Sequence, residues 1–322
     1  MPVEQQTPLV SAIITTLNRP DIVVRAIETV LEQTYTNLEL IIIVDGPDNA
    51  TATRLSALSD PRARVVVLPQ NVGLGEARNA GARESKGEWL AFLDDDDEWV
   101  PTKLSIQMQE VLRSGNQTNF SASRFEERTG AEIRLRPKFF PAAGEHWSES
   151  FYCNKILLLP STFLVKTSLM LAFPFTKGLR RHEDADWLLR GQQAGLFHPH
   201  WVAEPLTIYH CETSKDRLST HTEWRGRYQW YLDNPSLLTR KAVPFYIAML
   251  CIPEARSSPT PVAACTFLVK EAMSRGKMSI SAIGYLALST LSSRNWRSKL
   301  RGRFPILQRR TSWRNNGLPK PL

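Results

Sequence analysis

At 322 residues, the chain is long enough for one large α/β domain with an appendage, or for two modest domains. Its 42% hydrophobic and 22% charged residues are ordinary for a soluble globular protein, and four cysteines without a CxxC pair exclude a disulfide-rich scaffold. No apolar stretch reaches the roughly 18 residues of a membrane-spanning helix, and the N-terminus lacks the basic and apolar segments of a signal peptide. We therefore expect a cytoplasmic protein with reduced thiols.

The formal net charge of +8 is unevenly spread along the chain. From Arg240 onward there are 15 Lys or Arg residues and two acids, which leaves 25 basic and 30 acidic residues before that point. The first part is therefore net −5 and the last part net +13. This asymmetry predicts two parts with different partners, an α/β domain over residues 1–225 and a helical, basic region over residues 226–322.

Four short apolar runs alternate with helical patterns in the first hundred residues. The predicted strands cover residues 9–16, 38–44, 64–68 and 88–93. After the first strand, Asn18 is a candidate helix cap and Pro20 suits a first helical turn; after the second, Asp45 marks a turn. The alternation predicts a mostly parallel central sheet flanked by helices.

The segment 71–81 contains Gly73 and Gly75, but Arg78 occupies the third glycine position of a dinucleotide fingerprint. The segment also follows the third strand rather than the first, so a nicotinamide cofactor is disfavoured. Two interpretations of Arg78 stay open: a cation that pairs with phosphate oxygens, or a surface helix arginine.

The fourth strand ends in four consecutive aspartates, Asp94 to Asp97. Carboxylates this close repel one another unless a cation neutralises them, and the carboxyl ends of strands are where α/β sheets bind ligands. The pattern favours an oxygen-ligand site for Mg²⁺ or Mn²⁺ that carries a phosphate, over a solvated acidic turn.

A second acidic cluster lies at residues 183–186, at the predicted start of a helix. Glu183 and Asp186 are interpreted as helix-capping acids, whereas Asp184 is a candidate base. An edge-like strand over residues 206–209 is predicted to end at His210, which is more often a structural residue than a ligand.

Taken in order, these segments resemble the family 2 glycosyltransferases, which are nucleotide-sugar enzymes of the GT-A fold. The resemblance covers about residues 8–212. It rests on VSAIITTLNRP, ELIIIVDG, GEARNAG, FLDDDDEW and HEDADW. Many members carry a second acid before the aspartate of the second motif and a serine after its glycine, where this chain has Val44 and Pro47.

The resemblance implies a role for each matching residue. The residues that would bind the nucleotide sugar are Thr15, Leu17, Asn18, Arg19 and Asp45, with Arg78 by the diphosphate and Asp95 near the ribose. Asp96 and Asp94 would bind the metal, and His210 would approach the metal or the diphosphate. Asp184 would be the catalytic base. The implied activity is an inverting, metal-assisted transfer of a sugar from a nucleoside diphosphate donor, most often a UDP-sugar, to a saccharide or lipid-linked acceptor. The implied cofactor is Mn²⁺ or Mg²⁺. Two alternatives stay open: a non-catalytic nucleotide-sugar- or saccharide-binding relative, and a nucleotidyltransferase that makes the activated sugar.

The C-terminal region combines apolar helical segments with arginines. Ile280, Ile283, Ala287 and Leu291 can share a stripe, and a basic segment with Trp296 follows. This pattern is typical of a helix that lies in a membrane interface, but a helical cap packed on the first domain fits equally well. No nucleic-acid-binding module accompanies the charge, so nucleic acid is not an expected partner. If the region does bind lipid, the protein is peripheral at the cytoplasmic face of the inner membrane.

Overall fold

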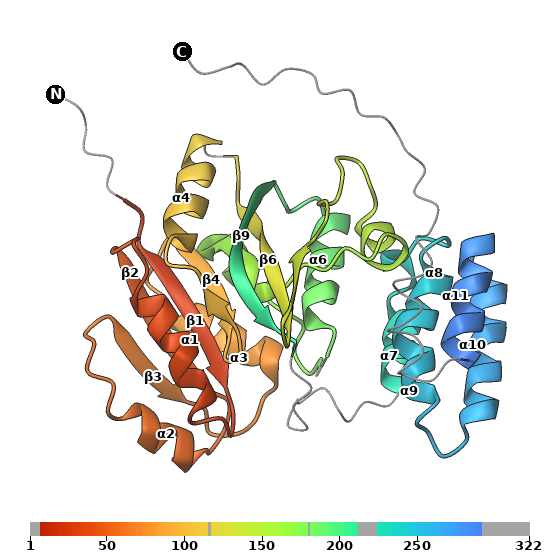
Figure 1. The fold of residues 1–322 in the computed structure, drawn as a ribbon, viewed down its shortest axis with the longest axis horizontal. Coiled ribbons are helices and arrows are strands. Elements are labelled where there is room, and N and C mark those ends of the chain that lie inside the picture. Colours follow the sequence, from red (N-terminus) through yellow and green to blue (C-terminus); the bar gives the residue numbers. More distant parts are fainter. Residues whose placement is uncertain (1–6, 115–116, 180, 212–223, 292–322) are drawn as a thin grey trace. The chain divides into compact units, whose positions relative to one another are not determined.

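The computed structural model describes residues 7–114, 117–179, 181–211 and 224–291. The chain divides into two compact units, Met1–Thr220 and His221–Leu322, and each is considered by itself. Figure 1 shows a twisted sheet with helices in the first unit and helices alone in the second.

The described part of the first unit contains one sheet of nine strands, with the order β3-β2-β1-β4-β8-β6-β9-β5 and with β7 paired to β6. The strands are β1 (Val10–Thr16), β2 (Leu38–Val44), β3 (Ala63–Val67), β4 (Trp89–Asp94), β5 (Glu98–Trp99), β6 (Phe120–Thr129), β7 (Glu132–Arg136), β8 (Phe163–Lys166) and β9 (Pro199–His210). The helices are α1 (Ile22–Leu31), α2 (Asn49–Leu55), α3 (Leu74–Glu84), α4 (Lys103–Arg113), α5 (Thr167–Ala172) and α6 (Glu183–Gln193).

The N-terminal half of the sheet is parallel, as predicted. β1 pairs in parallel with both β2 and β4, and every residue of β1 and β2 is buried, because helices cover both faces. The register places Thr15 at the end of β1 opposite Asp94 at the end of β4. The polar ends of these strands therefore meet at one edge of the sheet.

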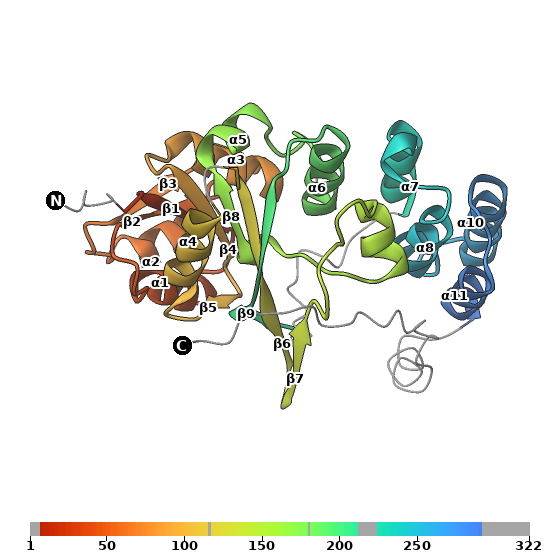
Figure 2. The same cartoon turned by 90° about the horizontal axis from the view of Figure 1, so that it is seen from above.

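The remainder of the sheet is mixed. β8 is antiparallel to β4 and β6, whereas β6 and β9 are parallel. The strand predicted to end at His210 is confirmed, but it starts earlier and is not at an edge there: β9 spans Pro199–His210 and pairs on both sides, with β6 and with the two-residue β5. The β6–β7 hairpin extends beyond the sheet in Figure 2.

Helices pack on opposite faces of the parallel strands. Val23 and Val30 of α1 and Met108 of α4 join one buried cluster with alternate residues of β1, β2 and β4. On the other face α3 approaches β1 so closely that a Cβ at Gly81 would lie 2.5 Å from Ile13 Cγ2. Glycine at this position therefore lets α3, and the arginine it carries, sit directly on the sheet.

The predicted cap at Asn18 was wrong. α1 begins at Ile22, and Asn18 adopts a left-handed backbone with a φ of 54°. Its backbone N–H donates to Asp48 Oδ2 (2.6 Å), and Asp48 Oδ1 accepts from the N–H of Thr51 in the first turn of α2 (3.0 Å). Asp48 thus caps α2 and holds the loop after β1 at the same time.

A buried lysine lies between α4 and the sheet. Lys103 is fully buried, its Nζ donates to Gln107 Oε1 (2.6 Å), and it lies 4.2 Å from the ring centroid of Trp99. Burial lowers the pKa of Lys103 to about 7. Between pH 7 and pH 10 the unfolded state therefore binds more protons than the folded state, and the free energy of unfolding contains a term that rises with pH.

We expect Lys103→Met to remove this term, which is at most about 1.4 kcal/mol per pH unit. Urea unfolding at several pH values between 7 and 10 measures it. Lys138→Met, at an exposed position, should leave the wild-type slope unchanged. Parallel pH profiles for wild type and Lys103→Met would contradict a neutral lysine at this position.

The described part of the second unit is helical. Its α-helices are α7 (Trp224–Asp233), α8 (Val243–Tyr246), α9 (Ile252–Ala255), α10 (Pro261–Arg275) and α11 (Ile280–Leu291), and a π-helical turn at Ile247–Cys251 joins α8 to α9. α10 and α11 both pack on the α8–α9 segment. Tyr246 and Ile252 of this segment and Leu268 of α10 are buried. The basic segment with Trp296 lies outside the described residues. None of the helices in the described residues is both long enough and apolar enough to cross a membrane.

Candidate active site

The four aspartates after β4 alternate between buried and accessible positions. The side chains of Asp94 and Asp96 are 28% and 34% exposed, whereas that of Asp95 is 8% exposed and Asp97 is 1% exposed. A tight turn, in which the N–H of Asp97 donates to the carbonyl of Asp94 (3.1 Å), produces the alternation. The run is therefore two pairs of carboxylates with different surroundings.

Asp95 and Asp97 face the protein. Asp95 accepts from Thr16 Oγ1 (2.7 Å) and from Arg19 Nη1 (2.8 Å), and Asp97 Oδ2 accepts from Ser161 Oγ (2.6 Å). Burial raises the pKa of Asp95 to about 6 despite these donors to it. Burial and a neighbouring carboxylate hold the pKa of Asp97 well above its ordinary value. These contacts fix the turn against β1 and the segment before β8.

Asp94 and Asp96 are the accessible pair, although Asp94 also bonds a buried arginine. Asp96 Oδ2 accepts from Arg19 Nη1 (3.1 Å), and its backbone carbonyl accepts from Arg25 Nη2 (2.9 Å). Among the residues with described positions, no three His, Cys, Asp or Glu side chains are grouped to hold a metal ion. Two accessible carboxylates one residue apart fit a different arrangement, in which a divalent cation is shared with the phosphates of a substrate.

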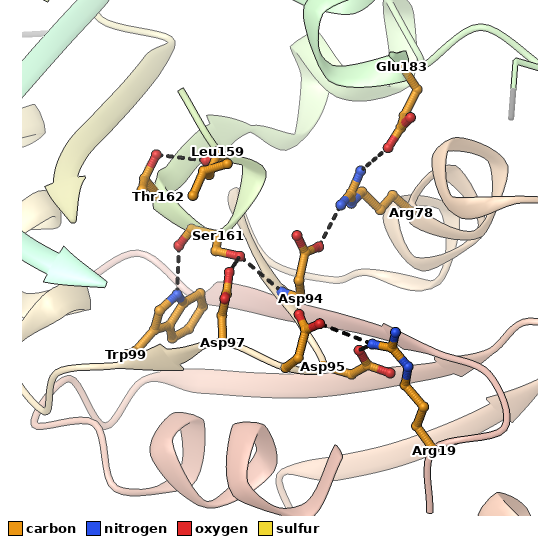
Figure 3. Close-up of polar contacts among 11 residues, drawn as sticks. Arg19, Arg78, Asp94, Asp95, Asp97, Trp99, Leu159, Ser161, Thr162 and Glu183 are labelled. Carbon is orange, nitrogen blue, oxygen red and sulfur yellow. Dashed lines mark hydrogen bonds and ion pairs between the residues drawn. The ribbon is translucent and has the colours of Figure 1, made fainter. Parts of the chain in front are cut away.

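Arg78 of α3 joins the acidic turn to helix α6 (Figure 3). Its Nη2 donates to Asp94 Oδ1 (2.5 Å) and its Nη1 donates to Glu183 Oε1 (3.1 Å), and its side chain is 2% exposed. Burial acts to lower the pKa of Arg78, but the two carboxylates outweigh it and hold the pKa above its ordinary value. The guanidinium is thus a buried cation between two acids. Nothing in the described residues tests whether it also contacts a diphosphate, so that contact stays a prediction.

Asp184 lies in the first turn of α6, beside this ion pair. The helix follows His182, which has a left-handed φ of 69° and whose Nε2 is 2.8 Å from the hydroxyl of Tyr152. Burial raises the pKa of Asp184, although the backbone N–H of Ala185 and the guanidinium of Arg78 oppose the increase. A partly buried carboxylate with a raised pKa suits a residue that accepts a proton.

Packing fixes the direction of α6. Trp187 is fully buried, with its ring centroid 4.7 Å from that of Phe197 and 5.5 Å from that of Phe175. Asp186 accepts from Thr176 Oγ1 (2.6 Å) and from Arg190 Nε (2.7 Å). Asp186 therefore has a structural role, whereas Asp184 lies near enough to Arg78 and Asp94 for their charges to act on its pKa.

Other residues with predicted roles lie at the same edge of the sheet. Thr15 is buried at the end of β1, and its Oγ1 has no hydrogen-bond partner within the described ranges. Leu17 is partly buried in the loop that follows. Asp45 accepts from the N–H groups of Val72 (2.8 Å) and Gly73 (3.0 Å), so it anchors the loop that enters α3. Contacts of Thr15, Leu17 and Asp45 with a nucleotide stay predictions.

His210 lies at the end of β9, next to β5. Its Nε2 is 2.6 Å from Glu98 Oε1, and Glu98 also pairs with Arg25 Nε (3.1 Å). The ring is therefore held by a carboxylate at the edge of the acidic turn. Its approach to a metal or a diphosphate stays a prediction.

Two residues of the site were not predicted from sequence. Ser161 donates to Asp97 and accepts from the backbone N–H of Asp94 (3.1 Å), so its hydroxyl connects the first and last aspartates of the turn (Figure 3). Glu183 was interpreted as a helix cap, but its side chain pairs with Arg78; burial and Asp184 raise the pKa of Glu183 to about 7. The adjacency of Glu183 to the predicted base was the one available signal.

Comparison with protein families identifies the family of the chain. The model described as "Glycosyl transferase family 2" matches residues 11–176, more than half of the chain, from β1 through the segment before α6. The chain belongs to glycosyl transferase family 2. This glycosyltransferase therefore has the enzyme class that the sequence motifs predicted.

Curated relatives agree with this assignment. An uncharacterized glycosyltransferase of Haemophilus influenzae is 30% identical over 232 residues, which are 66% of this chain and 72% of that protein. The UDP-Glc:alpha-D-GlcNAc-diphosphoundecaprenol beta-1,3-glucosyltransferase WfaP of Escherichia coli is 38% identical over 102 residues, which are 31% of this chain and 40% of that protein.

A solved structure shows the same fold. The crystal structure of S. aureus TarS 1-349 in complex with UDP-GlcNAc aligns with a TM-score of 0.57 at 13% identity, over 88% of this chain and 81% of that chain. The predicted GT-A fold of this glycosyltransferase is confirmed.

Proposed function

We propose that this glycosyltransferase moves a sugar from a UDP-sugar to a hydroxyl of a saccharide or lipid-linked acceptor, with inversion at the anomeric carbon. Asp184 takes the proton of the acceptor hydroxyl as its oxygen bonds to the anomeric carbon. The bond from that carbon to the diphosphate breaks on the opposite face. One base and one displacement give inversion.

The observation that supports this proposal most directly is the buried guanidinium between two acidic elements. Arg78 bonds Asp94 of the acidic turn and Glu183 of α6, the residue before Asp184. Arg78 thus connects the turn after β4, the candidate donor site, with the first turn of α6, which carries the candidate base. We propose that a donor binds at the turn while an acceptor reaches Asp184.

The accessible pair, Asp94 and Asp96, would hold Mn²⁺ or Mg²⁺ together with the diphosphate. When bound, the cation supplies positive charge that stabilises the leaving diphosphate. The turn's internal pair, Asp95 and Asp97, keeps the accessible pair in place. Arg19 bridges both pairs, because its Nη1 contacts Asp95 and Asp96.

The donor and the acceptor are proposed from the relatives. TarS was crystallised with UDP-GlcNAc, and WfaP is named for a UDP-Glc donor and a diphosphoundecaprenol-linked acceptor. A lipid-linked acceptor places the reaction at a membrane, and we propose the cytoplasmic face, where nucleotide sugars are made.

This function can be tested by incubating the enzyme and Mn²⁺ with a panel of nucleotide sugars, each combined with lipid-linked or free saccharides as acceptors. We expect one UDP-sugar to release UDP in an acceptor-dependent reaction whose product has the opposite anomeric configuration to the donor, as measured by NMR. Donor binding without turnover in the whole panel would favour a non-catalytic binding relative. Pyrophosphate release from a sugar phosphate and a nucleoside triphosphate would favour a nucleotidyltransferase.

Asp96→Asn tests the assignment of the cation. Asp96 is the more accessible of the pair, and Arg19, its ion-pair partner, also bonds Asp95, so the loss of the Asp96 charge should leave the fold intact. We expect the Mn²⁺ concentration for half-maximal activity to rise at least about tenfold. Asp97→Asn is the matched comparison, because the amide oxygen of Asn can still accept from Ser161 Oγ and hold the turn, and it should change the Mn²⁺ dependence much less than Asp96→Asn does. The reverse pattern would move the cation to the inner pair.

A further inference from the structure

Helix α6, which carries the candidate base, starts from an uncommon backbone conformation. His182 is the residue before its first turn, and its φ of 69° is left-handed, a conformation that side chains other than asparagine and aspartate seldom adopt. The carbonyl of His182 accepts from the N–H of Asp186 (2.9 Å), so His182 already takes part in the hydrogen bonding of the helix. The direction in which the chain leaves His182 therefore sets where Glu183 and Asp184 lie.

The ring of His182 is held by Tyr152. The hydroxyl of Tyr152 lies 2.8 Å from His182 Nε2, and the two rings stack with their centroids 6.1 Å apart and 25° between their planes. Tyr152 belongs to the π-helical turn Glu149–Cys153 and is buried. A left-handed residue persists where its surroundings hold it, and such residues cluster at active sites. The buried tyrosine supplies this support at the start of α6.

The segment that carries Tyr152 is also attached to the other end of α6. Gln192, in the last turn of the helix, accepts from the backbone N–H of Trp147 (2.7 Å) and donates to the carbonyl of Glu145 (2.7 Å). Trp147 is buried as well. Residues 145–152 therefore contact α6 at both of its ends, and the position of the Tyr152 hydroxyl is defined relative to the helix that it supports.

We propose that Tyr152 is a positioning residue for sugar transfer: its hydroxyl orients His182 and thereby holds Asp184 where it can take the proton of the acceptor hydroxyl. The role rests on the proposed function, because it requires Asp184 to be the base. Arg78 bonds Glu183 in the same turn of α6, so the turn is held through two different residues. Proton transfer depends steeply on the placement of the base, and a small displacement of this turn therefore lowers the rate.

Steady-state kinetics of Tyr152→Phe in the full-length chain tests the proposal, because this change removes the hydroxyl and keeps the buried ring. We expect kcat to fall about 10–10²-fold, with the KM for the UDP-sugar within about twofold of wild type. His182→Asn should act in the same way, since Asn tolerates a left-handed backbone but lacks the imidazole. Both variants should let water reach Asp184 and so move the acid limb of the pH–rate profile to lower pH, because burial raises the pKa of Asp184.

Tyr35→Phe is the matched control. It also removes one tyrosine hydroxyl, which donates to the carbonyl of Pro8 before β1 starts, at the opposite end of that strand from the acidic turn. This variant should keep the wild-type kcat and acid limb. A wild-type kcat and an unmoved acid limb in Tyr152→Phe would overturn the proposal, because the Tyr152 hydroxyl would then serve the fold alone.

A double variant separates the role of Tyr152 from the proposed function. If Tyr152 acts through Asp184, adding Tyr152→Phe to Asp184→Asn should lower the residual kcat by less than about twofold. A second full loss in the double variant would overturn the positioning role and leave Asp184 as the base. Wild-type turnover in Asp184→Asn would instead remove the base itself, and with it the role of Tyr152.

Discussion

Replacing Asp184 with Asn is expected to lower kcat for sugar transfer by about 10²–10⁴-fold, because the acceptor hydroxyl loses its proton acceptor. The affinity for UDP, measured by calorimetry, should stay close to that of wild type, because the turn with Asp94 and Asp96 is unchanged. Burial raises the pKa of Asp184, so the acid limb of the wild-type pH–rate profile should lie above the pKa of about 3.9 of a free aspartate.

The matched control for Asp184→Asn is Asp186→Asn on the same helix. Asp186 bonds Thr176 and Arg190 rather than the site, so this variant should lower stability but keep turnover. Retained turnover in Asp184→Asn, with the acid limb of the profile unmoved, would remove Asp184 as the base.

The second large effect is expected at Arg78. Arg78→Met leaves Asp94 and Glu183 without their buried cation, and breaking a buried ion pair in this way costs about 3–5 kcal/mol. We therefore expect a large drop in the free energy of unfolding, measured in urea. The double variant Arg78→Met/Glu183→Gln should recover part of the loss, because it removes one of the uncompensated carboxylates.

Arg83→Met provides the comparison within the same helix. Arg83 pairs with Glu76 but is 56% exposed, so its loss should cost less than about 1 kcal/mol. Similar losses for Arg78→Met and Arg83→Met would show that the Arg78 network does not hold α3, β4 and α6 together.

The parallel half of the fold could be predicted because each of its strands is marked by a pattern in consecutive residues. β1 and β2 are short, nearly continuous apolar runs separated by helical patterns, and such runs indicate strands buried on both faces. How the strands of the mixed half pair could not be predicted. The two residues of β5 give no pattern, and β9 pairs with β6 across two register shifts that only the folded chain defines.

The sequence predicted which residue types form the site, but not which way each side chain faces or what it contacts. Four adjacent aspartates are equivalent in sequence, and the contacts that distinguish them come from far along the chain. Thr16 lies 79 residues from Asp95, and Ser161 lies 64 residues from Asp97. Likewise, Arg78 and Glu183 are 105 residues apart, so neither the burial of the arginine nor the pairing of the glutamate has a local signal.

A crystal of the enzyme with UDP and Mn²⁺, measured at the manganese absorption edge, tests the central claim most directly. That claim is that Asp94 and Asp96 hold the cation while Asp95 and Asp97 hold the turn. We predict one anomalous peak bonded to Asp94, Asp96 or both and to the diphosphate, with Asp184 on the opposite side of the donor. A peak on Asp95 or Asp97, or a diphosphate bound without manganese, would contradict it.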